Sequence, residues 1–185
     1  MGTDIGMVSD EIAIEVAEYG YEVHALRLSE YLAEEAAEDF RDKMFDERVW
    51  AAMDAGNELR AAWGRSDALA LHAISDIVAT REQLSPSHDD DAQAGYLERH
   101  AFILRSLKTP DELETLRAVY GPRLIVIAAY SPEEQRLEHL ATQIARSRGT
   151  KDRTRWIHQP EDLIDREREG GTGRRPRRQR DVPSR

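Results

Sequence analysis

The feature that most constrains the fold is a pattern that occurs twice in the second half of the chain. In each copy, an apolar run of strand length precedes a Thr-Pro or Ser-Pro pair and then an amphipathic helix. The copies read "HAFILRSLK" with "TPDELETLRAVYG", and "RLIVIAAY" with "SPEEQRLEHLATQIARS". A strand–helix–strand–helix order with apolar strands indicates a parallel sheet with helices packed against it. We therefore predict an α/β fold.

Both of these helices have a sequence that is typical of a capping box. Thr109 can cap the first helix, Pro110 fits its first position, and Glu112 stands three residues after the cap. The Ser, Pro and second Glu of residues 131–134 are expected to do the same in the second copy. Residues 124–129 are continuously apolar, which favours a strand that is covered on both faces.

The first half of the chain is predicted to be mainly helical. Apolar spacings of three and four predict helices at about 5–19, 29–37, 48–63 and 67–82, and a last one near 160–169. Residues 21–28 alternate as a strand does. Residues 83–95 lack periodicity and contain the acidic run "HDDD", so we expect an exposed loop there rather than a metal site.

Charge and composition divide the chain into a body, residues 1–169, and a tail, residues 170–185. The net charge is −10, yet the tail holds six Arg and one Asp. Its Gly/Pro/Arg composition predicts a disordered, solvated tail, with a basic RNA-binding arm as the alternative. The acidic body gives no support for nucleic-acid binding.

The absence of certain residues and patterns from the sequence excludes several classes of function. There is no cysteine, which rules out disulfides, thiolate chemistry and zinc sites built on Cys. No apolar run approaches the roughly 18 residues that span a bilayer, and the start does not resemble a secretory signal. A cytoplasmic protein without membrane contact is therefore expected. The six histidines are scattered without i, i+4 pairs, so no metal site is predicted.

The predicted strand ends supply candidate ligand-binding residues, because open α/β sheets bind ligands beyond the carboxyl ends of their strands. These residues are Arg27, Ser29, Arg105, Ser106, Lys108, Tyr130 and Ser131. Cations beside a helix N-terminus suit an anion. The alternative is local: Arg105 pairs with Asp111 or Glu112, and Lys108 is only solvated.

A second candidate patch lies on the helix predicted at 48–63. Asn57 and Arg60 are three residues apart, and Arg65 follows the helix. Asn and Arg together can bind a base edge or a phosphate, while the alternative is a solvated polar helix face. Gly56 within the helix costs about 1 kcal/mol relative to Ala, which indicates close packing or a close ligand.

Motif searches exclude several kinds of catalysis. The phosphate-binding pattern G-x-x-x-x-G-K-[ST] is absent, and Gly2, Thr3 and Asp4 before the first helix are the sole candidate remnant. The zinc deaminase residues H-x-E and P-C-x-x-C are also absent, as is a G-x-S-x-G nucleophile elbow.

Four segments, taken together and in order, resemble the N-terminal region of anti-phage deoxycytidylate deaminases. They read "YGYEVHALRLSEYL", "AMDAGNELRAAWGRSDALALHAI", "AFILRSLKTPDELETLRAVYG" and "LIVIAAYSPEEQRLEHL". The resemblance covers about residues 2–169. It implies a P-loop kinase-like, three-layer domain whose mostly parallel sheet has about three to four strands. It also implies that the first strand is missing and that Gly2-Thr3-Asp4 ends a phosphate loop.

In that family a zinc-dependent deaminase domain follows the kinase-like domain, and none of its catalytic residues occurs here. The resemblance therefore implies a nucleotide ligand and no zinc of the deaminase kind. We expect a truncated reading frame that retains a nucleotide-binding or regulatory part without deaminase activity.

Two other functions stay open: a small nucleotide kinase-like protein with a degenerate phosphate loop, and a non-enzymatic RNA- or protein-interaction domain. Loss of the Walker lysine weakens the kinase interpretation. Unpaired strand edges could also drive homo-oligomer formation.

Overall fold

The computed structural model describes residues 1–35, 39–84, 98–152, 156 and 158–168. These residues form seven α-helices, one short 3-10 helix and two strands. In chain order the elements are α1 (Ile5–Glu18), β1 (Glu22–Arg27), α2 (Leu28–Glu35), α3 (Phe45–Trp63), α4 (Ala68–Leu84), β2 (His100–Arg105), α5 (Pro110–Tyr120), η1 (Gly121–Arg123), α6 (Glu133–Ser147) and α7 (His158–Arg168).

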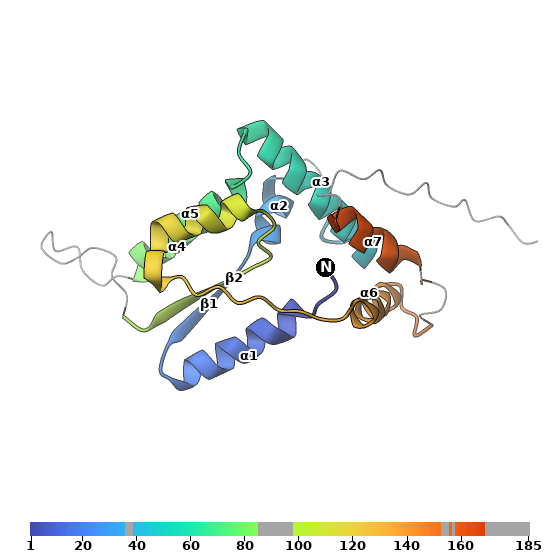
Figure 1. Ribbon diagram of the computed structural model, residues 1–185, viewed down its shortest axis with the longest axis horizontal. Helices are drawn as coiled ribbons and strands as arrows, with labels where there is room; N and C mark the ends of the chain where they lie inside the picture. The colour runs from blue at the N-terminus through green and yellow to red at the C-terminus, as the bar shows by residue number, and fades with distance from the viewer. Residues whose placement is uncertain (36–38, 85–97, 153–155, 157, 169–185) are drawn as a thin grey trace, which may run out of the picture.

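The two strands pair in parallel and form a small sheet. Glu22 lies opposite His100 at one end of the ladder, and Arg27 lies opposite Arg105 at the other. Helices α2, α3 and α4 form the connection between the strands. Helix α1 lies on one side of the sheet, and α4 and α5 lie on the other (Figure 1). The prediction of an α/β fold with a parallel sheet is confirmed, although the described part of the chain is mostly helical.

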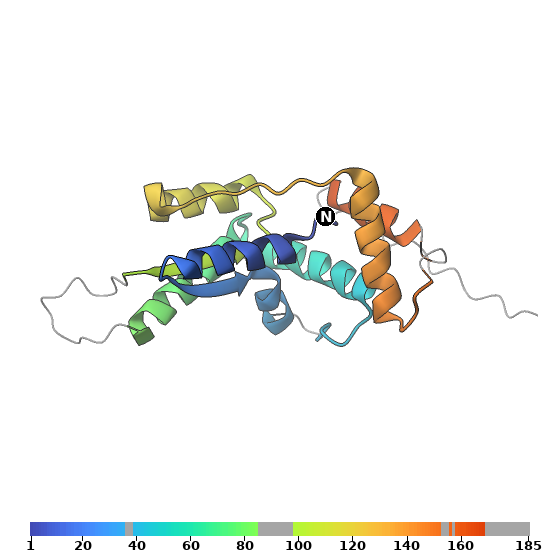
Figure 2. The same cartoon turned by 90° about the horizontal axis from the view of Figure 1, so that it is seen from below.

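The main core lies among α2, α3 and α4. Its buried side chains are Leu28, Leu32, Ala33, Phe40, Leu59, Ala68, Leu69 and Ala73. Gly56 of α3 faces α2, and a Cβ there would lie 3.5 Å from Leu32 Cδ1, which is an ordinary van der Waals distance. Helices α6 and α7 pack against α3 and lie at the opposite end of the molecule from α5 (Figure 2).

The capping box of α5 is confirmed. Thr109 Oγ1 accepts a hydrogen bond from the Glu112 backbone N–H at 3.2 Å, and the Glu112 side chain accepts one from the Thr109 N–H at 3.1 Å. The corresponding prediction for α6 is wrong. Pro132 occupies the N-cap and makes no side-chain cap, so Ser131 lies outside the helix. Glu134 is the second helical residue, whereas a capping box needs a glutamate at the third.

The prediction of a strand over "RLIVIAAY" is wrong. After η1, residues 124–132 run back along the outside of the molecule without forming a strand (Figures 1 and 2). Ile125 is 81% exposed and Ile127 is 60% exposed. An apolar run becomes a buried strand only when it reaches a free strand edge, and this segment pairs with neither described strand. The sheet of the described residues therefore has two strands instead of three or four.

This arrangement predicts that the 124–130 segment contributes little to stability. Replacing Ile125 by Ser should change the free energy of unfolding by no more than about 0.5 kcal/mol, because its side chain is already in water. Urea unfolding followed by circular dichroism measures this difference. A loss of about 2 kcal/mol or more would mean that Ile125 is buried, as a paired strand requires.

The other predicted elements occur with small shifts at their ends. Helix α2 begins at Leu28, directly after β1, and α4 extends to Leu84. The rest of the predicted 83–95 loop and the basic tail at 170–185 lie outside the described residues. Among the described helices, none combines the length and apolar character that crossing a membrane requires.

Candidate functional site: a cationic cluster beyond the strand ends

The candidate site lies beyond the carboxyl ends of β1 and β2, where the N-terminal segment of the chain passes. Figure 1 shows the N-terminus near the centre of the molecule, and Figure 2 shows it beside α6 and α7. Both strands end in arginine, and the turn after β2 leads into the capped start of α5. This position agrees with the general rule for ligand sites in open parallel sheets.

Arg105 ends β2 and faces the first turns of α1. Its side chain is 12% exposed, and its Nη1 atom lies 4.0 Å from Asp10 Oδ1. The buried Nε atom has no hydrogen-bond partner among the described residues. Arg105 therefore does not form the predicted local pair with Asp111 or Glu112, and its donors are incompletely used.

Glu112 is fully buried and joins the β2–α5 turn to α3. Its Oε1 atom accepts a hydrogen bond from Arg60 Nη2 at 3.1 Å. Its Oε2 atom accepts hydrogen bonds from the backbone N–H groups of Lys108 at 2.6 Å and Thr109 at 3.1 Å. Arg60 Nε is buried without a partner in the described part of the chain. One carboxylate thus holds both Arg60 and the turn that carries Lys108.

Lys108 lies at the same turn and reaches toward α7. Its Nζ atom donates to Glu167 Oε1 at 2.6 Å, and 42% of its side chain is exposed. Partial burial lowers the pKa of Lys108, the nearby Arg60 charge lowers it further, and Glu112 opposes both effects. Ser106, two residues earlier, has φ of 74°, a left-handed conformation that is uncommon outside glycine. This sharp turn separates the directions of Arg105 and Lys108.

Arg136 of α6 contacts the N-terminal segment of the chain. Its Nη1 atom donates to the Met1 carbonyl at 3.3 Å. Gly2 has φ of +89°, and a Cβ there would lie 2.8 Å from the Cβ and carbonyl oxygen of Arg136. Only glycine fits this position, so Gly2 serves the packing of the N-terminal segment on α6.

The Met1 amino group lies in a partly buried region that also holds several positive charges. Burial lowers its pKa to about 6, and the charges of Lys108, Arg136 and Arg168 add to that effect. The pKa is lowered although the amino group forms an ion pair with Glu167. Burial is therefore the main cause of the lowered pKa, and the surrounding cations add to it.

We call Arg60, Arg105, Lys108 and Arg136 the cationic cluster. They come from α3, β2, the β2–α5 turn and α6, respectively. Three of them keep a buried guanidinium Nε without a partner among the described residues. Arg105 faces α1, whereas Arg60 and Lys108 lie at the start of α5. Guanidinium and ammonium groups can bind a phosphate or another multivalent anion through charge-assisted hydrogen bonds.

Asp4 has a different role from the one that a phosphate loop would give it. It caps α1, with Oδ1 accepting from the Met7 N–H at 3.0 Å, while the Thr3 carbonyl accepts from the Ile5 N–H at 2.8 Å. A negative charge at this helix start disfavours a phosphate at the same amides. Any anion would then bind to the side chains of the cationic cluster.

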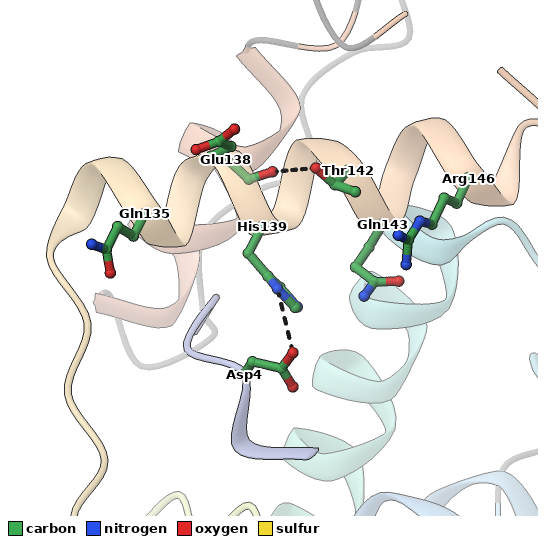
Figure 3. A pocket seen from close by; sticks show the side chains of 7 residues that line it. All are labelled: Asp4, Gln135, Glu138, His139, Thr142, Gln143 and Arg146. Atoms are coloured by element: carbon green, nitrogen blue, oxygen red, sulfur yellow. Dashed lines mark hydrogen bonds and ion pairs between the residues drawn. The ribbon is translucent and has the colours of Figure 1, made fainter. Parts of the chain in front are cut away.

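A hollow of about 360 Å³ opens beside Asp4 along α6. Figure 3 shows His139 pointing toward the Asp4 carboxylate, with 3.8 Å between Nδ1 and Oδ2. The other lining residues are Gln135, Glu138, Thr142, Gln143 and Arg146. This open hollow has mixed charges and lacks the residues of the cationic cluster.

The structure separates Asn57 and Arg65 from one another. Asn57 lies on α3 one turn before Arg60 and is partly exposed. Arg65 lies after α3 and forms two hydrogen bonds of 2.8 Å with Asp67. Hydrogen bonds from Arg65 and Thr115 hold the pKa of Asp67 far below its usual range. Arg65 therefore serves the junction of α3, α4 and α5.

The remaining strand-end candidates lie in solvent. Arg27 forms an exposed ion pair with Glu30 at 3.8 Å, and α2 starts so soon after β1 that Ser29 lies within its first turn. Tyr130 is 87% exposed. None of these three contributes a buried donor to the cationic cluster.

Sequence reasoning missed Arg136, and it also missed a group formed by Glu22, His24 and His100 on the sheet. Nothing in the spacing of Arg136 distinguishes it from the other charged residues of α6. The histidines are 76 positions apart, so correct pairing of the two strands was the one signal that could have brought them together.

Comparisons of the chain with protein-family models, with curated proteins and with solved structures found no match. The fold and the cluster define an α/β domain with a cationic edge beyond its parallel strands.

Proposed function

We propose that this chain is a nucleotide-binding domain of the P-loop kinase-like class, and that its cationic cluster binds the phosphates of a deoxynucleotide. In this proposal the domain is related to the N-terminal part of an anti-phage deoxycytidylate deaminase. It binds a deoxycytidine nucleotide in a regulatory role and does not deaminate it, because the sequence contains no deaminase residues.

The observation that carries the proposal is the state of Arg105. Its guanidinium is almost buried at the end of a parallel strand, its paired carboxylate is 4.0 Å away, and its Nε lacks a partner among the described residues. Burying a charged group without full hydrogen bonding is costly, so such a group is usually matched by a ligand or partner. A phosphate would satisfy it.

The other members of the cluster support a ligand with more than one phosphate. Arg60 and Lys108 are linked through Glu112, and Arg136 donates a hydrogen bond to the Met1 carbonyl. The Lys108 ammonium binds Glu167, so a phosphate would have to compete with that ion pair. We therefore expect the affinity to increase with the number of phosphates.

Thermal unfolding with a series of ligands tests this proposal. We expect dCTP to raise the melting temperature more than dCMP does, and deoxycytidine to have no effect, since ligands that bind only the folded state stabilise it. A matched series of ATP, AMP and adenosine tests the preference for cytosine. Absence of any shift with the phosphorylated ligands would contradict the proposal.

The same samples separate the other two functions. Release of phosphate from a nucleoside triphosphate, or its transfer to dCMP, would favour the kinase-like alternative. Salt-sensitive RNA binding that disappears when residues 170–185 are deleted would favour an RNA-binding arm. Homo-oligomer formation is tested by light scattering on the same protein.

A further inference from the structure

The sheet brings two histidines and a glutamate together on one face. Side chains two residues apart along a strand point the same way, so Glu22 and His24 share a face of β1. Parallel pairing places His100 opposite Glu22 and Phe102 opposite His24. Four side chains that are far apart in the sequence therefore form one patch near the amino ends of the strands.

The nitrogen and oxygen atoms of this patch converge. His24 Nε2 lies 3.0 Å from His100 Nδ1. The Glu22 carboxylate approaches both rings, with 3.7 Å from Oε1 to His24 Nε2 and 3.9 Å from Oε2 to His100 Nδ1. A tetrahedral ion with bonds of about 2.0–2.2 Å holds its ligand atoms about 3.3 Å apart. The two ring nitrogens lie slightly closer together than this, and each Glu22 oxygen lies slightly farther from the ring nitrogen that it faces.

Packing holds both imidazole rings in place. The rings of His24 and His100 lie edge to edge, with centroids 5.3 Å apart, planes 10° apart and the facing nitrogens 3.0 Å apart. Phe102 stacks on His24 with centroids 4.8 Å apart. The two histidine side chains are 19% and 17% exposed, while Glu22 is 62% exposed. The donors are thus largely fixed, and solvent reaches them from the side of Glu22.

We propose that Glu22, His24 and His100 bind a transition-metal dication of the zinc class, with a remaining coordination position open to water. Two imidazole nitrogens with one carboxylate oxygen suit Zn²⁺, whereas Ca²⁺ and Mg²⁺ prefer oxygen ligands alone. Because two nitrogens bound to one tetrahedral ion lie about 3.3 Å apart, the two rings would move slightly apart from their 3.0 Å separation. Each ring would then give a lone pair to the ion, and the ion would balance the Glu22 charge. It would also join the two strands, which the chain connects through α2, α3 and α4. This site is independent of the nucleotide site proposed above.

The competing explanation is a direct N–H···N hydrogen bond between two neutral rings, which the 3.0 Å separation also fits. The two explanations differ in where the protons lie. Metal at His24 Nε2 leaves the proton on Nδ1, and metal at His100 Nδ1 leaves it on Nε2. A direct hydrogen bond instead requires a proton on one of the two facing nitrogens.

Titration of the full, untagged chain with Co²⁺, followed by displacement with Zn²⁺, tests the proposal. His88 is replaced by Gln in every protein, so that the "HDDD" segment outside the described residues does not add a histidine ligand. We expect about one tightly bound ion per chain, with the intense visible absorption of four-coordinate Co²⁺. H24Q and H100Q should each weaken binding at least about tenfold, as loss of a ligand requires. The control, H158Q, removes an exposed imidazole that lies 3.4 Å from Glu161 and should not change the affinity.

A measurement on protein with both histidines intact avoids any dependence on how well the variants fold. Long-range ¹H–¹⁵N spectra should place the protons on His24 Nδ1 and His100 Nε2 when Zn²⁺ is added. Unchanged imidazole resonances with Zn²⁺ would overturn the proposal and favour the direct hydrogen bond. Equal Co²⁺ affinity in H24Q, H100Q and H158Q would overturn it as well.

Discussion

Replacing Glu112 by Gln is expected to lower the free energy of unfolding by about 3–5 kcal/mol. The carboxylate is fully buried and accepts hydrogen bonds from Arg60, the Lys108 N–H and the Thr109 N–H. Glutamine has the same shape but no charge. Its NH₂ group would face either the Arg60 guanidinium or the backbone N–H groups of Lys108 and Thr109, all of which are donors. The Arg60 guanidinium, 17% exposed, would lose its carboxylate. Chemical denaturation with a fixed m-value measures the loss.

Two further variants make this expectation specific. Glu114 lies on the same helix and is exposed, so E114Q should change stability by no more than about 0.5 kcal/mol. Replacing Arg60 by Met in the E112Q background should recover part of the loss, because the buried charge is then removed with its partner. A cost below about 1 kcal/mol for E112Q would show that the Arg60–Glu112 pair is not buried as described.

Replacing Arg105 by Gln is expected to weaken dCTP binding about 10- to 100-fold, which corresponds to the 1.5–3 kcal/mol typical of hydrogen bonds to charged groups. The fold should be retained, because the ion pair of Arg105 with the exposed Asp10 is long, at 4.0 Å. Isothermal titration calorimetry at constant ionic strength gives both affinities. The effect should diminish at high salt, since part of it is electrostatic.

The matched control for this experiment is Arg117→Gln. Arg117 is exposed in the last turn of α5, at the opposite end of that helix from Lys108. The R117Q substitution removes the same charge from the protein as R105Q does, without altering the cationic cluster. Equal losses of affinity in R105Q and R117Q would mean that net charge, and not the cluster, determines binding.

The sequence predicts those parts of the fold that depend on neighbouring residues. The α5 capping box is local, since Thr109 and Glu112 satisfy each other across three residues. The apolar run at 124–130 has strand composition, but pairing requires a free edge from a distant segment. Sequence alone therefore could not show that these residues stay unpaired and exposed.

The candidate site also combines residues that local sequence patterns indicate with residues that only the folded chain brings together. The strand-end rule located Arg105 and Lys108, and helix spacing indicated Arg60. The sequence predicted Glu112 as a helix cap, yet its buried contact with Arg60 joins residues 52 positions apart. Arg136 and Glu167 enter through the packing of α6 and α7 beside the N-terminal segment, which no local pattern indicates.

The most direct test of the central claim is to follow the Arg105 side chain itself during nucleotide binding. Its Nε–H group gives a ¹H–¹⁵N signal that the R105Q variant assigns, and dCTP is added stepwise to the wild-type chain. The account predicts that the Arg105 Nε–H signal shifts strongly and saturates with the calorimetric affinity, while the Arg117 signal does not move. Saturable dCTP binding that leaves the Arg105 signal unchanged would contradict it.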